Sequence, residues 1–322
     1  MVEADKKKAG LLGLLLGDAA GVPFEFNAPS DIANLPPGAV DFPPHLPPEF
    51  NRAHKSAPQG AWSDDGAMAL ALLDSLNQTK ELDLTDLSSR FLAWKAGEYA
   101  PDGVVFDIGN QVRQGLARIE KGADPSHAGP SMETDNGNGS LMRVLPLALW
   151  HEGANDELVE YAHLQSLPTH GHLRAGVVCA LYCLWARELL NGSHDGFDEA
   201  LDALEAVYVE QGNLDALKEL HKVLDDETRP PRGTGYVVDT LWSVRHAFLS
   251  SDRFEDVVKN AIKLGNDTDT TAAISGGLAG IRGGMEGLPE AWLNYLAKHP
   301  FLDTALGILD PKSPKPGKRR LS

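Results

Sequence analysis

Two segments of the chain combine carboxylates and hydroxyls at places where helices of small residues are expected to begin. The side chains that could act as ligands are Ser63, Asp64 and Asp65 in the first segment, and Asp267, Asp269 and Thr270 in the second. Helix capping explains part of this pattern, because a side-chain oxygen at a helix start accepts bonds from free backbone N–H groups. A cap needs only one oxygen, however, and the two segments together supply four carboxylates.

If the fold brings both helix starts together, the four negative charges repel one another and favour either protonation or bound cations. Neither motif contains a thiolate or an imidazole, so the donor set favours Mg²⁺, Mn²⁺ or Ca²⁺ over Zn²⁺. The spacing excludes an EF-hand, because Ala272 and Leu278 stand where that loop needs glycine and glutamate. Four carboxylates with hydroxyls suit two adjacent hard cations that share bridging ligands.

A glycine-rich turn is a candidate binding site for an anion. Its residues are Gly137, Asn138, Gly139 and Ser140, and an apolar run follows them. Free N–H groups at the start of a helix there could hold a pyrophosphate, and Arg143 could add positive charge. Turns of this composition are also common where no ligand binds, so both interpretations stay open at this point.

The two acidic segments resemble the paired signatures of the ADP-ribosylglycohydrolase family. Three further stretches agree with this resemblance: Gly17 to Phe26, Gly137 to Arg143, and Thr169 to Gly171. The match extends from about residue 10 to about residue 285 in the family's order, and it implies a compact all-helical domain. It also implies that the six ligand residues named above hold two divalent cations, Mg²⁺ or Mn²⁺. Ser63 replaces the family's more common threonine, and Asn266 replaces its second glycine.

A further segment, Phe106-Asp107-Ile108-Gly109, is similar to one in the bacterial hydrolases that reactivate dinitrogenase reductase by removing ADP-ribose from arginine. The resemblance implies that Asp107 faces the guanidinium group, whose planar fork pairs well with a carboxylate. Without the resemblance, Asp107 would be interpreted as the cap of a helix that begins near Ile108.

The resemblance also implies roles for four other residues. Glu25 is a candidate catalytic base, and Asp65 or Glu25 would orient the attacking water. His170 would contact the phosphate or ribose, and Tyr236 would pack against the nucleotide. The alternatives are an ordinary hydrogen-bonded histidine at a helix start and a core aromatic residue at helical spacing.

The resemblance therefore predicts an enzyme that removes ADP-ribose from modified protein side chains, with N-linked arginine as the expected linkage. A metal-activated water would attack the anomeric carbon of the ribose, and the expected partners are an ADP-ribosylated protein and ADP-ribose as product. Hydrolysis of other ADP-ribose linkages (serine, nucleobase or O-acetyl) and a catalytically silent ADP-ribose-binding regulator are alternatives. An HD-type phosphohydrolase is a further alternative, for which His194-Asp195 supplies only the dipeptide.

Helical periodicity dominates the elements that must position these residues. Apolar residues recur at helical spacing over residues 68–76, 87–94, 177–185, 237–248 and 257–264. A convincing strand pattern is absent, so we expect an all-α single domain of roughly a dozen helices over residues 1–310. Six prolines within residues 36–48 predict that residues 28–60 form a long loop or flap, either functional or passive. Residues 311–322 are rich in proline, lysine and arginine and predict a disordered basic tail.

Composition limits the classes of partner and compartment. The 322-residue chain has 29 basic and 46 acidic residues, and its formal charge of −17 disfavours nucleic acid and anionic membranes. Residues 6–16 superficially resemble a secretory signal, but the apolar run is short and contains Gly13, so we expect a buried first helix and no membrane span. Cys179 and Cys183 share one helical face, which fits a reducing compartment and a cytoplasmic protein.

Overall fold

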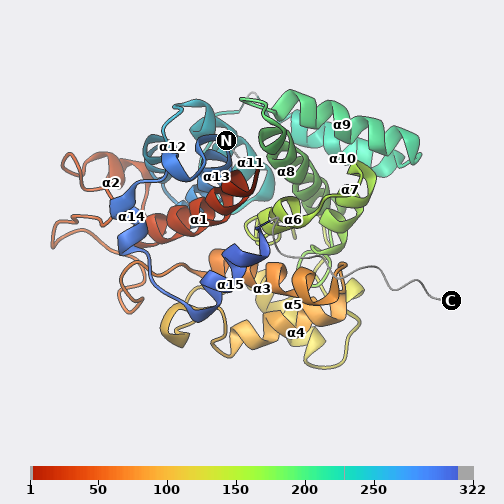
Figure 1. The fold of residues 1–322 in the computed structure, drawn as a ribbon, viewed down its shortest axis with the longest axis horizontal. Coiled ribbons are helices and arrows are strands. Elements are labelled where there is room, and N and C mark those ends of the chain that lie inside the picture. The colour runs from red at the N-terminus through yellow and green to blue at the C-terminus, as the bar shows by residue number, and fades with distance from the viewer. Residues whose placement is uncertain (1–2, 228, 311–322) are drawn as a thin grey trace.

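The computed structural model describes residues 3–227 and 229–310, and the regular structure in this part of the chain is helical (Figure 1). It contains fifteen α-helices and four single-turn 3₁₀ helices, with one isolated antiparallel bridge between Gly137 and Tyr236 as the only β-type pairing among the described residues. The predicted all-α single domain is confirmed. The predicted basic tail, residues 311–322, lies outside the described residues.

The α-helices are α1 (Glu3–Gly21), α2 (Pro29–Ala33), α3 (Asp64–Thr79), α4 (Leu84–Lys95), α5 (Asn110–Ile119), α6 (Leu145–Trp150), α7 (Asn155–Leu164), α8 (Leu173–Asn191), α9 (Phe197–Glu210), α10 (Leu214–Leu224), α11 (Val237–Leu249), α12 (Phe254–Ile262), α13 (Thr268–Gly283), α14 (Glu290–Tyr295) and α15 (Pro300–Ile308). The 3₁₀ helices are η1 (Val22–Phe24), η2 (Pro101–Gly103), η3 (Pro125–His127) and η4 (Met285–Gly287). The five helical stretches predicted from periodicity fall on α3, α4, α8, α11 and α12.

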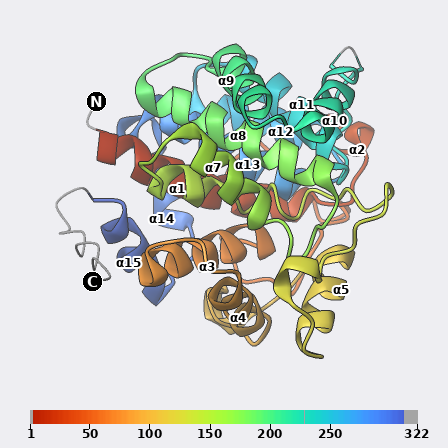
Figure 2. The same ribbon diagram turned by 90° about the vertical axis from the view of Figure 1, so that its right-hand side faces the viewer.

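The two helices at the centre, α1 and α13, lie side by side at close backbone distance (Figures 1 and 2). Glycines allow this contact: a Cβ atom added to Gly17 would lie 2.1 Å from the Ala272 carbonyl oxygen, and one added to Gly21 would lie 2.5 Å from Asp269 Cα. The Thr268 hydroxyl donates a 2.9 Å hydrogen bond to the Gly21 carbonyl. The end of α1 is therefore fixed against the start of α13, which carries the second acidic segment.

The remaining helices pack around this central pair. Helices α8, α11 and α12 contact α13, and α7, α9 and α10 pack on the outer side of α8. Figure 2 shows α3, α4 and α5 as a layer beneath α1. Because α3 contacts both α1 and α13, its first turn, which carries the first acidic segment, reaches the same end of the central pair.

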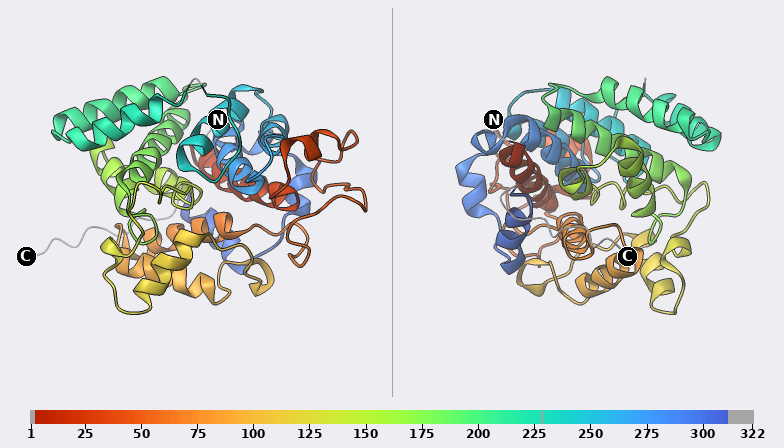
Figure 3. Two further views of the ribbon diagram at one scale, coloured as in Figure 1. Left: turned by 180° about the vertical axis from the view of Figure 1, so that it is seen from behind. Right: turned by 45° about the vertical axis from the view of Figure 1, so that its right-hand side comes forward.

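The predicted proline-rich loop, residues 28–60, begins with a short helix, α2. Proline is compatible with the first position of a helix, and Pro29 occupies that position, so this helix forms before the later prolines end it. The rest of the segment follows the outside of the molecule without regular helix (Figure 3, left). It is anchored, since Phe42 is buried with its ring 5.5 Å from that of Trp292 and His54 reaches Glu25.

The amino-terminal leucine run lies inside α1 and is buried, as expected for a first core helix. Among the described helices, none combines the length and the apolar character needed to cross a membrane.

Candidate active site

The starts of α3 and α13 converge, although their acidic segments are some two hundred residues apart in the chain. The Thr270 hydroxyl donates a 3.3 Å hydrogen bond to Asp65 Oδ2, and the Ser63 hydroxyl donates one of 3.2 Å to the same oxygen. The Asp269 Oδ1 atom accepts from the Thr270 backbone N–H at 2.9 Å. Residues predicted from two separate motifs thus form one continuous cluster.

Capping does not account for this cluster. Ser63 is the N-cap of α3, and its hydroxyl accepts a hydrogen bond from the Asp65 N–H at 3.3 Å. Asp267 occupies the N-cap position of α13, but its side chain makes no capping hydrogen bond. The first turn of α3 is held instead by Asp18 of α1, whose carboxylate accepts from the Ser63 N–H at 2.9 Å and the Gly66 N–H at 2.8 Å. Sequence analysis gave Asp18 no role, and the only signal was its place in a stretch that matches the family.

The buried oxygens of the cluster fit a cation. Asp65 Oδ1 and Asp269 Oδ2 are buried and have no hydrogen-bond partner among the described residues. Burial raises the pKa values of both carboxyls well above 3.8, and repulsion from neighbouring carboxylates, Asp267 among them, raises them further. Oxygens of Glu25, Asp267 and Asp269 lie within 4.8 Å of one another. A divalent cation would supply the missing partner and the missing positive charge.

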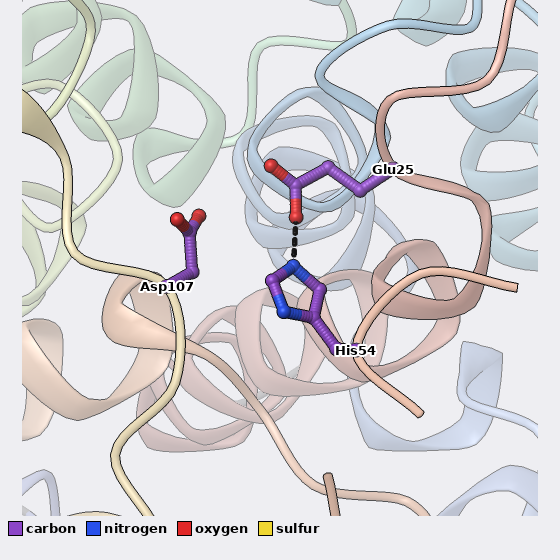
Figure 4. Close-up of side chains that lie close together, drawn as sticks. All are labelled: Glu25, His54 and Asp107. Carbon is purple, nitrogen blue, oxygen red and sulfur yellow. Dashed lines mark hydrogen bonds and ion pairs between the residues drawn. The ribbon is translucent and has the colours of Figure 1, made fainter. Parts of the chain in front are cut away.

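A histidine that sequence analysis missed contacts the predicted base. The His54 ring is hydrogen-bonded through Nε2 to Glu25 Oε2, and the Asp107 carboxylate lies beside this pair (Figure 4). Ligand atoms of the three residues lie within 4.8 Å of one another. Burial raises the pKa of Glu25 to about 7 against the opposing effect of the His54 bond, and the same bond raises the pKa of His54. His54 belongs to the proline-rich segment, where no pattern marks a functional residue.

Glu25 and Asp107 border a cavity of about 670 Å³. The predicted site residues that line it are Glu25, Asp64, Asp107, Gly137, Asn138, Gly139, His170, Asp267 and Thr270. Five others do not line it: Ser63, Asp65, Asp269, Ser140 and Tyr236. The first three of these are buried and join the wall through the bonds described above, so the acidic cluster forms one side of the cavity.

The glycine-rich turn borders the cavity but does not open a helix directly, because residues 141–144 separate it from α6. Asn138 ties the turn to the acidic cluster through a 2.7 Å hydrogen bond from Nδ2 to Asp267 Oδ2. Ser140 points into the core, where its hydroxyl accepts from Ser166 at 2.9 Å. Arg143 is buried against the Phe91 ring, 4.4 Å from its centre, and does not line the cavity, although its charge helps to lower the pKa of His170 in the cavity wall.

His170 is a buried member of the cavity wall. Its Nδ1 is 2.8 Å from the Thr169 hydroxyl, and a Cβ atom on Gly139 would lie 2.8 Å from its Cε1. Burial lowers the pKa of His170 to about 3, so the ring is neutral at physiological pH. It therefore offers a hydrogen bond rather than a positive charge.

Asp107 and Tyr236 differ in their relation to the cavity. The N-cap of α5 is Gly109, so Asp107 does not cap this helix. Asp107 lines the cavity instead. Asp107 has a left-handed φ of 50°, a costly conformation found often at functional positions. Tyr236 is half-buried, and its hydroxyl accepts a 3.1 Å hydrogen bond from Arg174 outside the cavity lining.

The His194-Asp195 dipeptide lies between α8 and α9. His194 is mostly exposed, and its ion pair is with the equally exposed Asp252 at 3.0 Å. Among the described residues, His194 belongs to none of the clusters that could hold a metal ion. This arrangement gives the HD-type alternative no support.

The helical fold and the acidic cavity wall together define a class, an all-α protein with a carboxylate-lined cavity that could hold a divalent cation. The ADP-ribosylglycohydrolase family model matches residues 2–314, and the chain belongs to this family. It is 31% identical to the ADP-ribosylarginine hydrolase Tri1 of Serratia proteamaculans, over 91% of this chain and 76% of that protein. It is 28% identical to the ADP-ribosyl-[dinitrogen reductase] glycohydrolase of Rhodospirillum rubrum, over 91% and 90% of the two chains.

Two further comparisons agree with the family and the fold. The chain is 27% identical to the ADP-ribosylhydrolase ARH3 of Bos taurus, over 88% of this chain and 86% of that protein. A solved ADP-ribosylglycohydrolase-related protein complex is similar with a TM-score of 0.73 and 30% identity, covering 95% of this chain and 96% of the other. The resemblance inferred from the motifs is therefore confirmed.

Proposed function

We propose that this chain is a metal-dependent hydrolase that releases ADP-ribose from modified protein side chains, with N-linked arginine as its main substrate. The observation that carries the proposal is the convergence of the α3 and α13 starts beside a cavity that also presents Glu25 and Asp107. The names of two relatives support release of ADP-ribose from a modified substrate, and one of them, an ADP-ribosylarginine hydrolase, supports the arginine linkage.

The cluster offers enough oxygen ligands for two cations. The residues that would hold two Mg²⁺ or Mn²⁺ ions are Ser63, Asp64, Asp65, Asp267, Asp269 and Thr270. The bound ions would supply positive charge that attracts the ribose hydroxyls and lowers the pKa of water. Unpartnered oxygens on Asp65 and Asp269 support this assignment, because a buried carboxylate without a partner is costly.

Glu25 and Asp107 have distinct roles in the proposed reaction. Water adds to the anomeric carbon while the bond from that carbon to the guanidine nitrogen breaks. Glu25 takes one proton of the water, and a pKa near 7 suits a base that works at neutral pH. Asp107 accepts N–H bonds from the guanidinium and, with a pKa raised by burial, assists protonation of the leaving nitrogen. His54 holds the Glu25 carboxylate in place.

The glycine-rich turn is the proposed site for the diphosphate. The turn contributes Gly137, Asn138 and Gly139 to the cavity wall, while Asn138 keeps it against the acidic cluster. His170, held neutral, would donate or accept a hydrogen bond at the same wall.

The decisive experiment measures free ADP-ribose released from a protein modified on arginine. Release in Mg²⁺ or Mn²⁺, its loss in EDTA and its recovery on adding the ion back support the proposal. Asp269→Asn should abolish release, whereas Asp202→Asn, on the exposed side of α9, should not. Binding of ADP-ribose without release would instead indicate a silent regulator.

The linkage is the second question for the same assay. The similarity to an ADP-ribosylhydrolase named without a linkage keeps serine, nucleobase and O-acetyl conjugates as candidate substrates. Comparing kcat/KM for these conjugates with the value for the arginine conjugate ranks them. A higher value for any of them would overturn the preference for arginine.

A further inference from the structure

Phe26 is an aromatic residue that the proposed mechanism does not use. Its side chain is 70% exposed, more than any other large apolar side chain in the described part of the chain, and it lines the cavity. It has a left-handed φ of 64°, which is unfavourable for a bulky residue. Its N–H donates to the Asn266 carbonyl at 2.7 Å, and the Asn266 N–H donates to the Asn27 carbonyl at 2.7 Å. These bonds fix the main chain at Phe26 in spite of the backbone strain, and the residue lines the cavity.

The surroundings of Phe26 combine aromatic rings with carboxylates. Its ring centre is 5.7 Å from that of His54, which is 5.1 Å from that of Phe106. Phe26 directly follows Glu25, and Phe106 directly precedes Asp107. Figure 4 shows the Glu25 and Asp107 carboxylates on either side of one space, next to His54. This part of the cavity therefore combines two carboxylates with an exposed aromatic ring.

A guanidinium group matches this combination. It is a flat cation whose edges donate N–H bonds to carboxylates and whose weakly hydrated faces stack on aromatic rings. A serine hydroxyl has neither the charge nor the flat face. We propose that Phe26 is the stacking wall of a guanidinium subsite, where it covers the face of the modified arginine whose edge pairs with Asp107. This inference rests on the proposed function and names the residue that selects arginine.

The position of Phe26 favours the arginine end of the substrate over the adenine end. In the proposed reaction, Glu25 and Asp107 lie near the anomeric carbon where the bond breaks. The ring of Phe26 is 5.7 Å from that of His54, which is bonded to Glu25. The adenine ring is separated from that carbon by two riboses and a diphosphate. A ring next to the base therefore lies beside the leaving group.

The test compares Phe26→Ala, Phe26→Trp and the wild-type chain, each loaded with Mn²⁺. Two ligands probe the two ends of the site, agmatine for the guanidinium and ADP-ribose for the nucleotide, with binding measured by calorimetry. We expect Phe26→Ala to weaken agmatine binding about tenfold, the size of a partly desolvated cation–π contact. Phe26→Trp should retain agmatine binding, and ADP-ribose binding should be unchanged in both variants. Leu214→Ala, which removes an exposed apolar side chain of α10, is the control.

Several outcomes would overturn the subsite. Agmatine binding that is equal in wild type and Phe26→Ala removes the stacking role, as does absence of saturable agmatine binding to the wild type. Weakened ADP-ribose binding in Phe26→Ala assigns the ring to the nucleotide instead. If Phe26→Ala loses turnover only with protein substrates and still binds agmatine as the wild type does, the Phe26 ring contributes to docking of the target protein instead. Failure of the wild type to release ADP-ribose from arginine would refute the proposed function, whereas agmatine binding tests the subsite without turnover.

Discussion

Replacing Asp269 by asparagine should stabilise the metal-free protein while it destroys the proposed metal site. Asp269 is 0% exposed, and one of its oxygens has no partner among the described residues. Protonating a carboxyl whose usual pKa is 3.8 costs about 5 kcal/mol at about pH 7.5. If Asp269 is protonated in the metal-free folded state, this cost is the largest amount by which the residue can reduce the free energy of unfolding. Asparagine has nearly the same shape and no charge. Its buried amide lacks a full set of partners, so we expect a net gain of about 2–4 kcal/mol.

The assay is thermal unfolding of wild type and variant, in EDTA and in excess Mn²⁺. At roughly 2 °C per kcal/mol, the variant should unfold about 4–8 °C higher than wild type in EDTA. Mn²⁺ should raise the midpoint of the wild type and leave that of the variant unchanged. Asp202→Asn makes the same chemical change on the exposed side of α9 and should behave as wild type throughout. A lower midpoint for Asp269→Asn in EDTA, or an undiminished response to Mn²⁺, would refute the reasoning.

Three further predictions test the base, the helix contact and the leaving-group carboxylate. In EDTA, stability should fall as the pH rises from about 6.5 to about 8, because the pKa of Glu25 is raised from 4.5 to about 7 and that of His54 is also raised, so the folded state binds more protons than the unfolded chain. The lowered pKa of His170 has the opposite effect on stability only below about pH 6.5, where the unfolded chain binds that proton. A rise of the melting temperature between about pH 6.5 and about pH 8 would contradict the prediction. Gly17→Ala should lower the free energy of unfolding, measured in urea, by about 3 kcal/mol through overpacking. Gly283→Ala, which has open space around its Cβ, should leave that free energy unchanged. Equal effects of the two substitutions would contradict the interpretation that α1 and α13 are in close backbone contact. Asp107→Ala should keep Mn²⁺ binding by calorimetry and lower kcat for arginine conjugates by roughly 10²–10⁴-fold; an unchanged kcat would remove Asp107 from the reaction.

Sequence patterns predicted the helices well because a buried helix repeats its apolar face every turn, and α3, α8 and α11 each carry that signal. They also predicted the two acidic segments, since several carboxylates at one helix start exceed what a cap needs. The contact between those segments could not be read directly, because it depends on glycines in α1 packing against α13. The family resemblance supplied it instead.

Other features had no local signal at all. His54 lies in an irregular segment and becomes significant only because the fold places it on Glu25. Arg143 is the opposite case, since a cation next to a glycine-rich turn suggests direct contact with a bound phosphate. In the fold its side chain turns into the core and bonds to Gln165. Side-chain direction in a turn depends on tertiary packing, which spacing alone does not encode.

The pairing of α1 with α13 has a consequence for biosynthesis. These helices lie near opposite ends of the described chain, and they pack against each other at close backbone distance. A ribosome must therefore synthesise the chain as far as α13 before the acidic cluster can form. Until then the first acidic segment emerges without the second, so partial chains cannot assemble the six-residue ligand set. Binding of the proposed metal ions should therefore be a late event that follows release of α13 from the exit tunnel.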